Sequence, residues 1–150
     1  MRQKLPLILI RLAVGLVFVT EGILKFVRPG ELGAGRFAAI GLPYPHQLAA
    51  LVGSIEIGAG AAVILNFFAG DAALLLLMVI VLELVLTKLP ILLGRPLGHF
   101  SVPKLSYYGL LSFLHESRTD LCMFAGTLAL LVDSGLQTKR KRFGSRSTDR

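Results

Sequence analysis

Two glutamates within long apolar runs are the residues of this chain best placed to do chemistry. Glu56 and Glu83 each lie near the middle of a stretch of about 20 apolar residues, the length of a membrane-spanning helix. A carboxylate at the bilayer centre costs at least about 2.5 kcal/mol, so such groups usually face a bundle interior and serve a function. We therefore take both glutamates as candidates for proton exchange or ligand binding.

The first apolar run carries a polar stripe. At about 100° per residue, one face of a helix contains Arg11, Gly15, Phe18, Gly22 and Lys25. Small residues let helices approach closely, so we expect this face to pack against the second span, with its charges paired inside the bundle. We predict a buried ion pair between Arg11 and Glu56 or Glu83. For Glu21 and Lys25, the simplest interpretation is an ion pair between side chains four residues apart.

The same charged residues also have a purely structural interpretation. A buried polar network can specify helix packing without catalysing anything. The network predicted here comprises Arg11, Glu21, Lys25, Glu56 and Glu83. The single cysteine excludes a disulfide within the chain, and the three histidines lack the spacing of a metal site, so we expect no bound metal.

Composition predicts an all-α integral membrane protein. Hydrophobic residues make up 54% of the chain and the mean hydropathy is +0.72, more than a soluble domain of 150 residues needs for its core. Apolar runs predict a bundle of four transmembrane helices at residues 5–27, 46–69, 72–93 and 117–136. Asp71 is expected to cap the third helix.

The segments between the spans differ in character. Residues 28–45 are rich in Gly and Pro but retain apolar side chains, which favours a short interfacial helix between the first two spans. Residues 94–116 combine charge with tyrosine, as a loop at headgroup level does. The membrane domain is thus expected to cover residues 1–136, followed by a basic, disordered cytoplasmic tail at 137–150.

Several residues spread along the chain follow a characteristic order and spacing. They are Arg11, Gly22 and Lys25, the Gly-Leu-Pro-Tyr-Pro run at 41–45, Glu56 followed by Gly60, and the stretch 120–128. In order and spacing they resemble the DoxX family of four-span bacterial membrane proteins, and the similarity covers residues 5–135. Where many members have a histidine before Leu-Pro, this chain has Lys88, which puts in doubt any role built on that histidine.

The resemblance implies a bacterial inner-membrane bundle, with some relatives described as subunits of quinone-linked oxidoreductases or as membrane anchors of redox complexes. One hypothesis is therefore a membrane subunit or scaffold of a redox complex, in which Arg11, Glu56 and Glu83 bind a quinone headgroup. A second is a small proton-coupled transporter, functioning as a homodimer, that uses a midplane glutamate. A third is a purely structural anchor. Partners are then the lipid bilayer and a redox enzyme, and not nucleic acid.

The charges at the chain ends predict that both termini are cytoplasmic. Arg2 and Lys4 precede the first span, and a basic cluster follows the fourth, as the positive-inside rule requires for an even number of spans. A C-terminal fusion to a reporter that fluoresces only in the cytoplasm should therefore be active. An alkaline phosphatase fusion active at the same site would contradict this topology.

Overall fold

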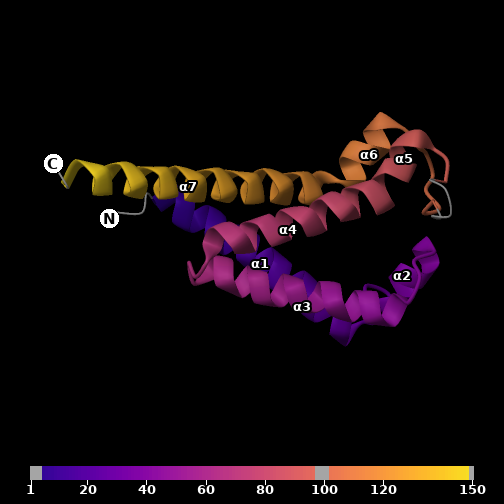
Figure 1. Cartoon of the computed structure of the whole chain (residues 1–150). Helices are drawn as coiled ribbons and strands as arrows, with labels where there is room; N and C mark the ends of the chain where they lie inside the picture. The colour runs from indigo at the N-terminus through magenta and orange to yellow at the C-terminus, as the bar shows by residue number, and fades with distance from the viewer. Residues whose placement is uncertain (1–4, 97–101, 149–150) are drawn as a thin grey trace.

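The molecule is a bundle of long helices with its short helices gathered at one end (Figure 1). The computed structural model of the chain describes residues 5–96 and 102–148, with side chains described as far as residue 135. Within these ranges all regular structure is helical. The elements are α1 (Leu5–Val27), α2 (Ala34–Ile40), α3 (Pro45–Ile64), α4 (Ala69–Glu83), the π-helical segment η1 (Leu84–Lys88), α5 (Leu89–Leu93), α6 (Leu110–Glu116) and α7 (Arg118–Thr148).

Within residues 5–96 and 102–148, three helical stretches are long and apolar enough to cross a membrane. They are α1, α3 and the continuous stretch Ala69–Leu93 that α4, η1 and α5 form together. These correspond to the first three predicted spans. The part of α7 whose side chains are described is not one of these three stretches; its apolar part, residues 121–132, lies between Asp120 and Asp133. The fourth span at 117–136 therefore stays a prediction.

The distribution of apolar side chains suits a membrane bundle. Large apolar residues such as Leu9, Leu75 and Met78 are about half exposed on the outer surface, where lipid rather than water would contact them. The core combines residues of four helices, namely Val14, Phe18, Ala59, Val63, Ala72, Ala73, Leu76, Ile80 and Leu130. α7 therefore belongs to the bundle, packing on α4 and α1 with part of its length.

Glycines bring α1 and α3 into close contact. A Cβ added to Gly22 would lie 2.6 Å from the carbonyl oxygen of Gly53, and one on Gly60 would lie 3.0 Å from the carbonyl oxygen of Gly15. No side chain larger than hydrogen fits at this distance without separating the helices. The five residues of the predicted polar face of α1 are all buried, in agreement with its periodicity.

A short turn makes α3 and α4 an antiparallel hairpin, as the sequence predicts (Figure 1). Asn66 and Phe68 turn the chain with positive φ angles of 57° and 45°. The prediction that Asp71 caps the helix is wrong. Phe68 occupies the cap position and Asp71 lies inside the first turn, where a carboxylate still interacts favourably with the helix dipole.

The third span contains a π-helical turn, η1, before Pro90. Proline lacks the N–H that an α-helix needs at this position, so the hydrogen-bond register must change nearby. The hydroxyl of Thr87 donates a 2.7 Å hydrogen bond to the carbonyl oxygen of Glu83. Glu83 directly precedes this turn, and Thr87 and Lys88 lie within it.

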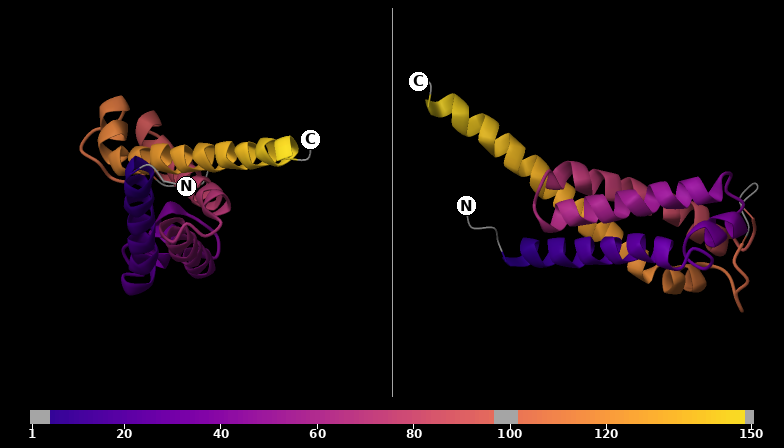
Figure 2. Two further views of the ribbon diagram at one scale, coloured as in Figure 1. Left: turned by 90° about the vertical axis from the view of Figure 1, so that its left-hand side faces the viewer. Right: turned by 90° about the horizontal axis from the view of Figure 1, so that it is seen from below.

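Shorter helices close one end of the bundle. A helix, α2, forms in the segment 28–45 and packs on α3, but its position at a membrane interface stays a prediction. The segment 94–116 contains α6, and residues 97–101 lie outside the described ranges. At the opposite end, α7 projects away from the other helices and continues to Thr148 (Figure 2). The backbone of α7 thus includes residues 137–148, in keeping with the good helix propensity of Lys and Arg, and the division into a membrane domain and a basic tail stays a prediction.

The glycine contact predicts a position-dependent effect of added methyl groups. Gly22→Ala should destabilise the bundle by about 1–3 kcal/mol, because the new Cβ overlaps the backbone of α3. Gly58→Ala is the matched control, since a Cβ there has no neighbour within 4 Å. Thermal unfolding in mild detergent measures both, and equal midpoints for the two variants would contradict the contact.

Candidate functional site

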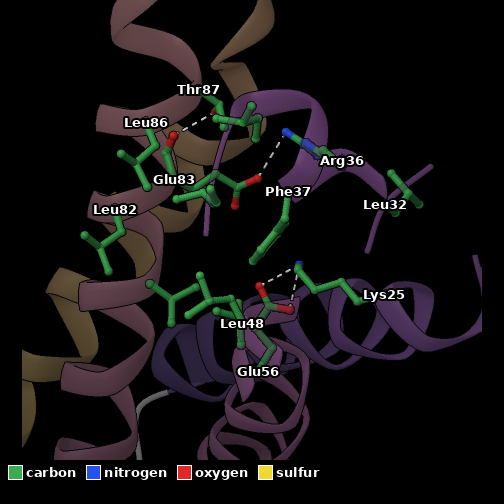
Figure 3. A pocket seen from close by; sticks show the side chains of 14 residues that line it. Lys25, Leu32, Arg36, Phe37, Leu48, Glu56, Leu82, Glu83, Leu86 and Thr87 are labelled. Atoms are coloured by element: carbon green, nitrogen blue, oxygen red, sulfur yellow. Dashed lines mark hydrogen bonds and ion pairs between the residues drawn. The ribbon is translucent and has the colours of Figure 1, made fainter. Parts of the chain in front are cut away.

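A pocket of about 190 Å³ lies between α1, α2, α3 and the third span (Figure 3). We call it the inner pocket. Two ion pairs stand on its walls, and most of its remaining lining is apolar. The lining residues are Lys25, Leu32, Arg36, Phe37, Ile40, Leu42, Leu48, Val52, Glu56, Val79, Leu82, Glu83, Leu86 and Thr87. It holds both glutamates singled out in the sequence.

The first ion pair joins α1 to α3. The Lys25 Nζ atom lies 2.9 Å and 2.7 Å from the two carboxylate oxygens of Glu56, and it donates a hydrogen bond to Oε1. The Lys25 side chain is 8% exposed and that of Glu56 only 1%. At this burial neither charge reaches bulk water, so each depends on the other for its stabilisation.

Helix direction explains why Glu56 pairs with Lys25 and not with Arg11. Gly15 faces Gly60 and Gly22 faces Gly53, an antiparallel register that puts Glu56 level with Val19. Lys25 is then about 9 Å along the axis and Arg11 about 12 Å in the other direction. Side chains tilt toward the N-terminus of their own helix, so Lys25 and Glu56 lean toward each other whereas Arg11 leans away.

The predicted pair between Arg11 and a glutamate is therefore wrong. Arg11 is buried, with its Nη2 atom 3.8 Å from Oδ2 of Asp133 on α7. Its Nε and Nη1 atoms have no hydrogen-bond partner among the described residues. Arg11 does not line the inner pocket, and its contact instead holds the apolar part of α7 against α1.

The second ion pair of the pocket joins α2 to the third span. The Nη2 atom of Arg36 lies 3.3 Å from Oε1 of Glu83, and both side chains are about a third exposed. Between the two pairs, the ring of Phe37 points from α2 into the pocket (Figure 3). Sequence reasoning missed Arg36 as a partner, although Arg36 and Ile40 stand four residues apart on the side of α2 that faces the pocket.

Glu21 does not join this cluster. It lies on the exposed side of α1, and Lys25 contacts Glu56 instead of Glu21. The i,i+4 interpretation is wrong because a buried carboxylate stabilises a buried ammonium more than an exposed one does. Of the five predicted network residues, Lys25, Glu56 and Glu83 come together at the pocket.

A third polar contact, not anticipated from the sequence, joins η1 to α6 and α7. Lys88 Nζ donates a 2.8 Å hydrogen bond to the carbonyl oxygen of Glu116 and lies 3.4 Å from Oδ2 of Asp120. Contacts across 28 or more residues leave no periodic signal in the sequence.

Because the Lys25 and Glu56 pair is buried, removing one of its two charges should destabilise the protein more than removing both. Lys25→Met should destabilise the protein by about 3–5 kcal/mol, because it leaves the Glu56 carboxylate buried and unpaired. Lys25→Met combined with Glu56→Leu should recover much of this loss. Unfolding in mild detergent, followed by circular dichroism, measures the changes.

The exposed pair between Arg28 and Glu31 supplies the control. Arg28→Ala should change stability by less than about 1 kcal/mol, since an exposed ion pair contributes little. A loss for Lys25→Met no larger than that for Arg28→Ala would contradict the role of the buried pair.

Comparison with known proteins agrees with this architecture. The DoxX family model matches residues 6–89, a range that includes both residues of the Lys25 and Glu56 pair. The chain is 42% identical over 142 residues to the uncharacterized membrane protein Rv3486 of Mycobacterium tuberculosis, covering 94% of this chain and 83% of that protein. No solved structure matches the sequence at a significant level. This chain therefore belongs to the DoxX family of membrane proteins.

Proposed function

We propose that the protein is the membrane subunit of a redox complex in the bacterial inner membrane and that the inner pocket binds the headgroup of a quinone. The observation that carries the proposal is the pocket itself, an apolar space with a carboxylate and a cation on each of two walls. A quinone headgroup is a flat apolar ring with a hydrogen-bond acceptor at two opposite positions. The pocket offers matching chemistry at both sides.

The donors of the pocket support this assignment. The ammonium group of Lys25 has three N–H bonds, and its two contacts with Glu56 leave one for a ligand carbonyl. The guanidinium group of Arg36 has five N–H donors, more than its contact with Glu83 requires. A quinone oxygen beside either pair would also lie near a carboxyl group able to exchange a proton.

The size of the pocket suits a single ring. Its volume of about 190 Å³ is below the roughly 300–1,000 Å³ typical of pockets that enclose drug-sized ligands. The isoprenoid tail of a quinone would therefore remain in the lipid. Leu82 both lines the pocket and is 57% exposed on the outer surface, which gives the tail a path along this side chain.

Transport of a cation is less well supported. Glu56 and Glu83, the two carboxylates of the pocket, already face the cations Lys25 and Arg36, which would repel a cationic substrate. Transport by a homodimer and a purely structural anchor are the alternatives. The following experiment distinguishes the quinone proposal from both.

Quinone should co-purify with the wild-type protein and be lost when the pocket is filled. We expect close to one quinone per chain after purification from native membranes in mild detergent, measured by solvent extraction and chromatography. Val79→Trp should lower this amount at least tenfold, because Val79 lines the pocket. Val81→Trp is the matched control, since Val81 is exposed on the same helix and does not line the pocket.

Proteins in the same preparation test the rest of the proposal. A dehydrogenase or other redox enzyme in stoichiometric amount is the expected partner. A homodimer that carries only lipid, with no thermal stabilisation by an added short-chain quinone, would contradict both the quinone and the redox complex.

A further inference from the structure

A second, more polar cavity adjoins the inner pocket. It has a volume of about 390 Å³, and we call it the outer cavity. Its lining residues are Arg36, Ala39, Ile40, Thr87, Lys88, Ile91, Val102, Pro103 and Glu116. Three of these, Arg36, Ile40 and Thr87, also line the inner pocket, so the two spaces meet at these side chains.

The outer cavity lies at the end of the molecule where α2, α5 and α6 gather (Figure 1). That is the end at which the chain leaves the third span, and Val102 and Pro103 of the connecting segment form part of the wall. The cavity walls carry the charged side chains of Arg36, Lys88 and Glu116. Polar walls of this kind hold water, whereas a comparable apolar cavity stays dry.

Glu83 stands where the two spaces meet. Its carboxylate lines the inner pocket and contacts Arg36, which lines both spaces. The hydroxyl of Thr87, one helical turn further, donates to the carbonyl oxygen of Glu83, and Thr87 also lines both spaces. Thr87 and Lys88 of the π-helical turn η1 line the outer cavity, whereas Glu83, which directly precedes the turn, lines the inner pocket.

Charged groups from all the surrounding elements face this junction. Lys25 of α1, Arg36 of α2, Glu56 of α3, Lys88 of η1 and Glu116 of α6 line one or both spaces, and Asp120 of α7 contacts Lys88. The three cations and three carboxylates balance, so a change in the protonation of Glu83 alters the net charge of an otherwise neutral set. Such a group exchanges protons readily only where water reaches it.

We propose that the outer cavity is a water-filled entrance through which Glu83 exchanges protons with the aqueous phase. In a chain that binds a quinone, which is the function proposed above, Glu83 then supplies protons to the bound ring. Reduction to a quinol takes two electrons and two protons. The electrons come from the redox enzyme of the complex. Each proton passes from the Glu83 carboxyl to a quinone oxygen, and water in the outer cavity returns a proton to the carboxylate.

Thiol labelling tests whether water reaches the junction. In a Cys122→Ser background, which removes the single native cysteine, Thr87→Cys should react with a small cationic methanethiosulfonate reagent in open membrane fragments. Val81→Cys, exposed on the outer surface of the same span, should stay unreactive because lipid excludes the thiolate and the reagent. Ser106→Cys, in the exposed connecting segment, is the positive control.

Filling each space separately distinguishes this proposal from the quinone proposal. Ala39 lines only the outer cavity, so Ala39→Trp should reduce labelling of Thr87→Cys at least tenfold while the bound quinone is retained. Val79→Trp should remove the quinone and leave the labelling in place. Absence of quinone together with labelled Thr87→Cys would overturn only the quinone proposal.

Two outcomes would overturn the water entrance. One is an unreactive Thr87→Cys in membranes where Ser106→Cys is fully labelled. The other is labelling of Thr87→Cys that Ala39→Trp does not slow, which would mean that the reagent arrives by another route.

Discussion

The bundle depends on the requirement that a charge buried among apolar helices has an opposite charge beside it. The ion pair of Lys25 and Glu56 meets this requirement between α1 and α3, where the two side chains are 8% and 1% exposed. Glycines bring α1 and α3 close enough for the pair to form. The inner pocket lies beside the pair, and α2 and the third span form its other walls.

Three further ion pairs repeat this requirement between other elements. Arg36 connects α2 to Glu83, Lys88 connects η1 to Asp120, and Arg11 connects α1 to Asp133. Each pair joins segments that are distant in the chain. In lipid, no hydrophobic force drives helices together. Polar contacts between helices therefore help to specify which helices are neighbours. The candidate site thus uses the same charges that hold the helices in their relative positions.

The site combines two features that favour proton exchange beside an apolar ligand. One is a small apolar pocket whose carboxylates each have a cation nearby, and the other is a π-helical turn that displaces the third span from regular geometry. The π-helical turn lies between Glu83, which directly precedes it, and Pro90, and Thr87 lies within it. Local departures of this kind are frequent at functional sites in helical proteins.

The sequence by itself determined three of the spans and the buried face of α1, because hydrophobic length and helical periodicity are local properties. It also singled out Glu56 and Glu83, since a charge within an apolar run is visible without a structure. Only the tertiary structure decided the partners. Arg11 contacts Asp133 and Lys25 contacts Glu56, because the antiparallel register and the tilt of side chains toward each helix N-terminus set which long side chains meet.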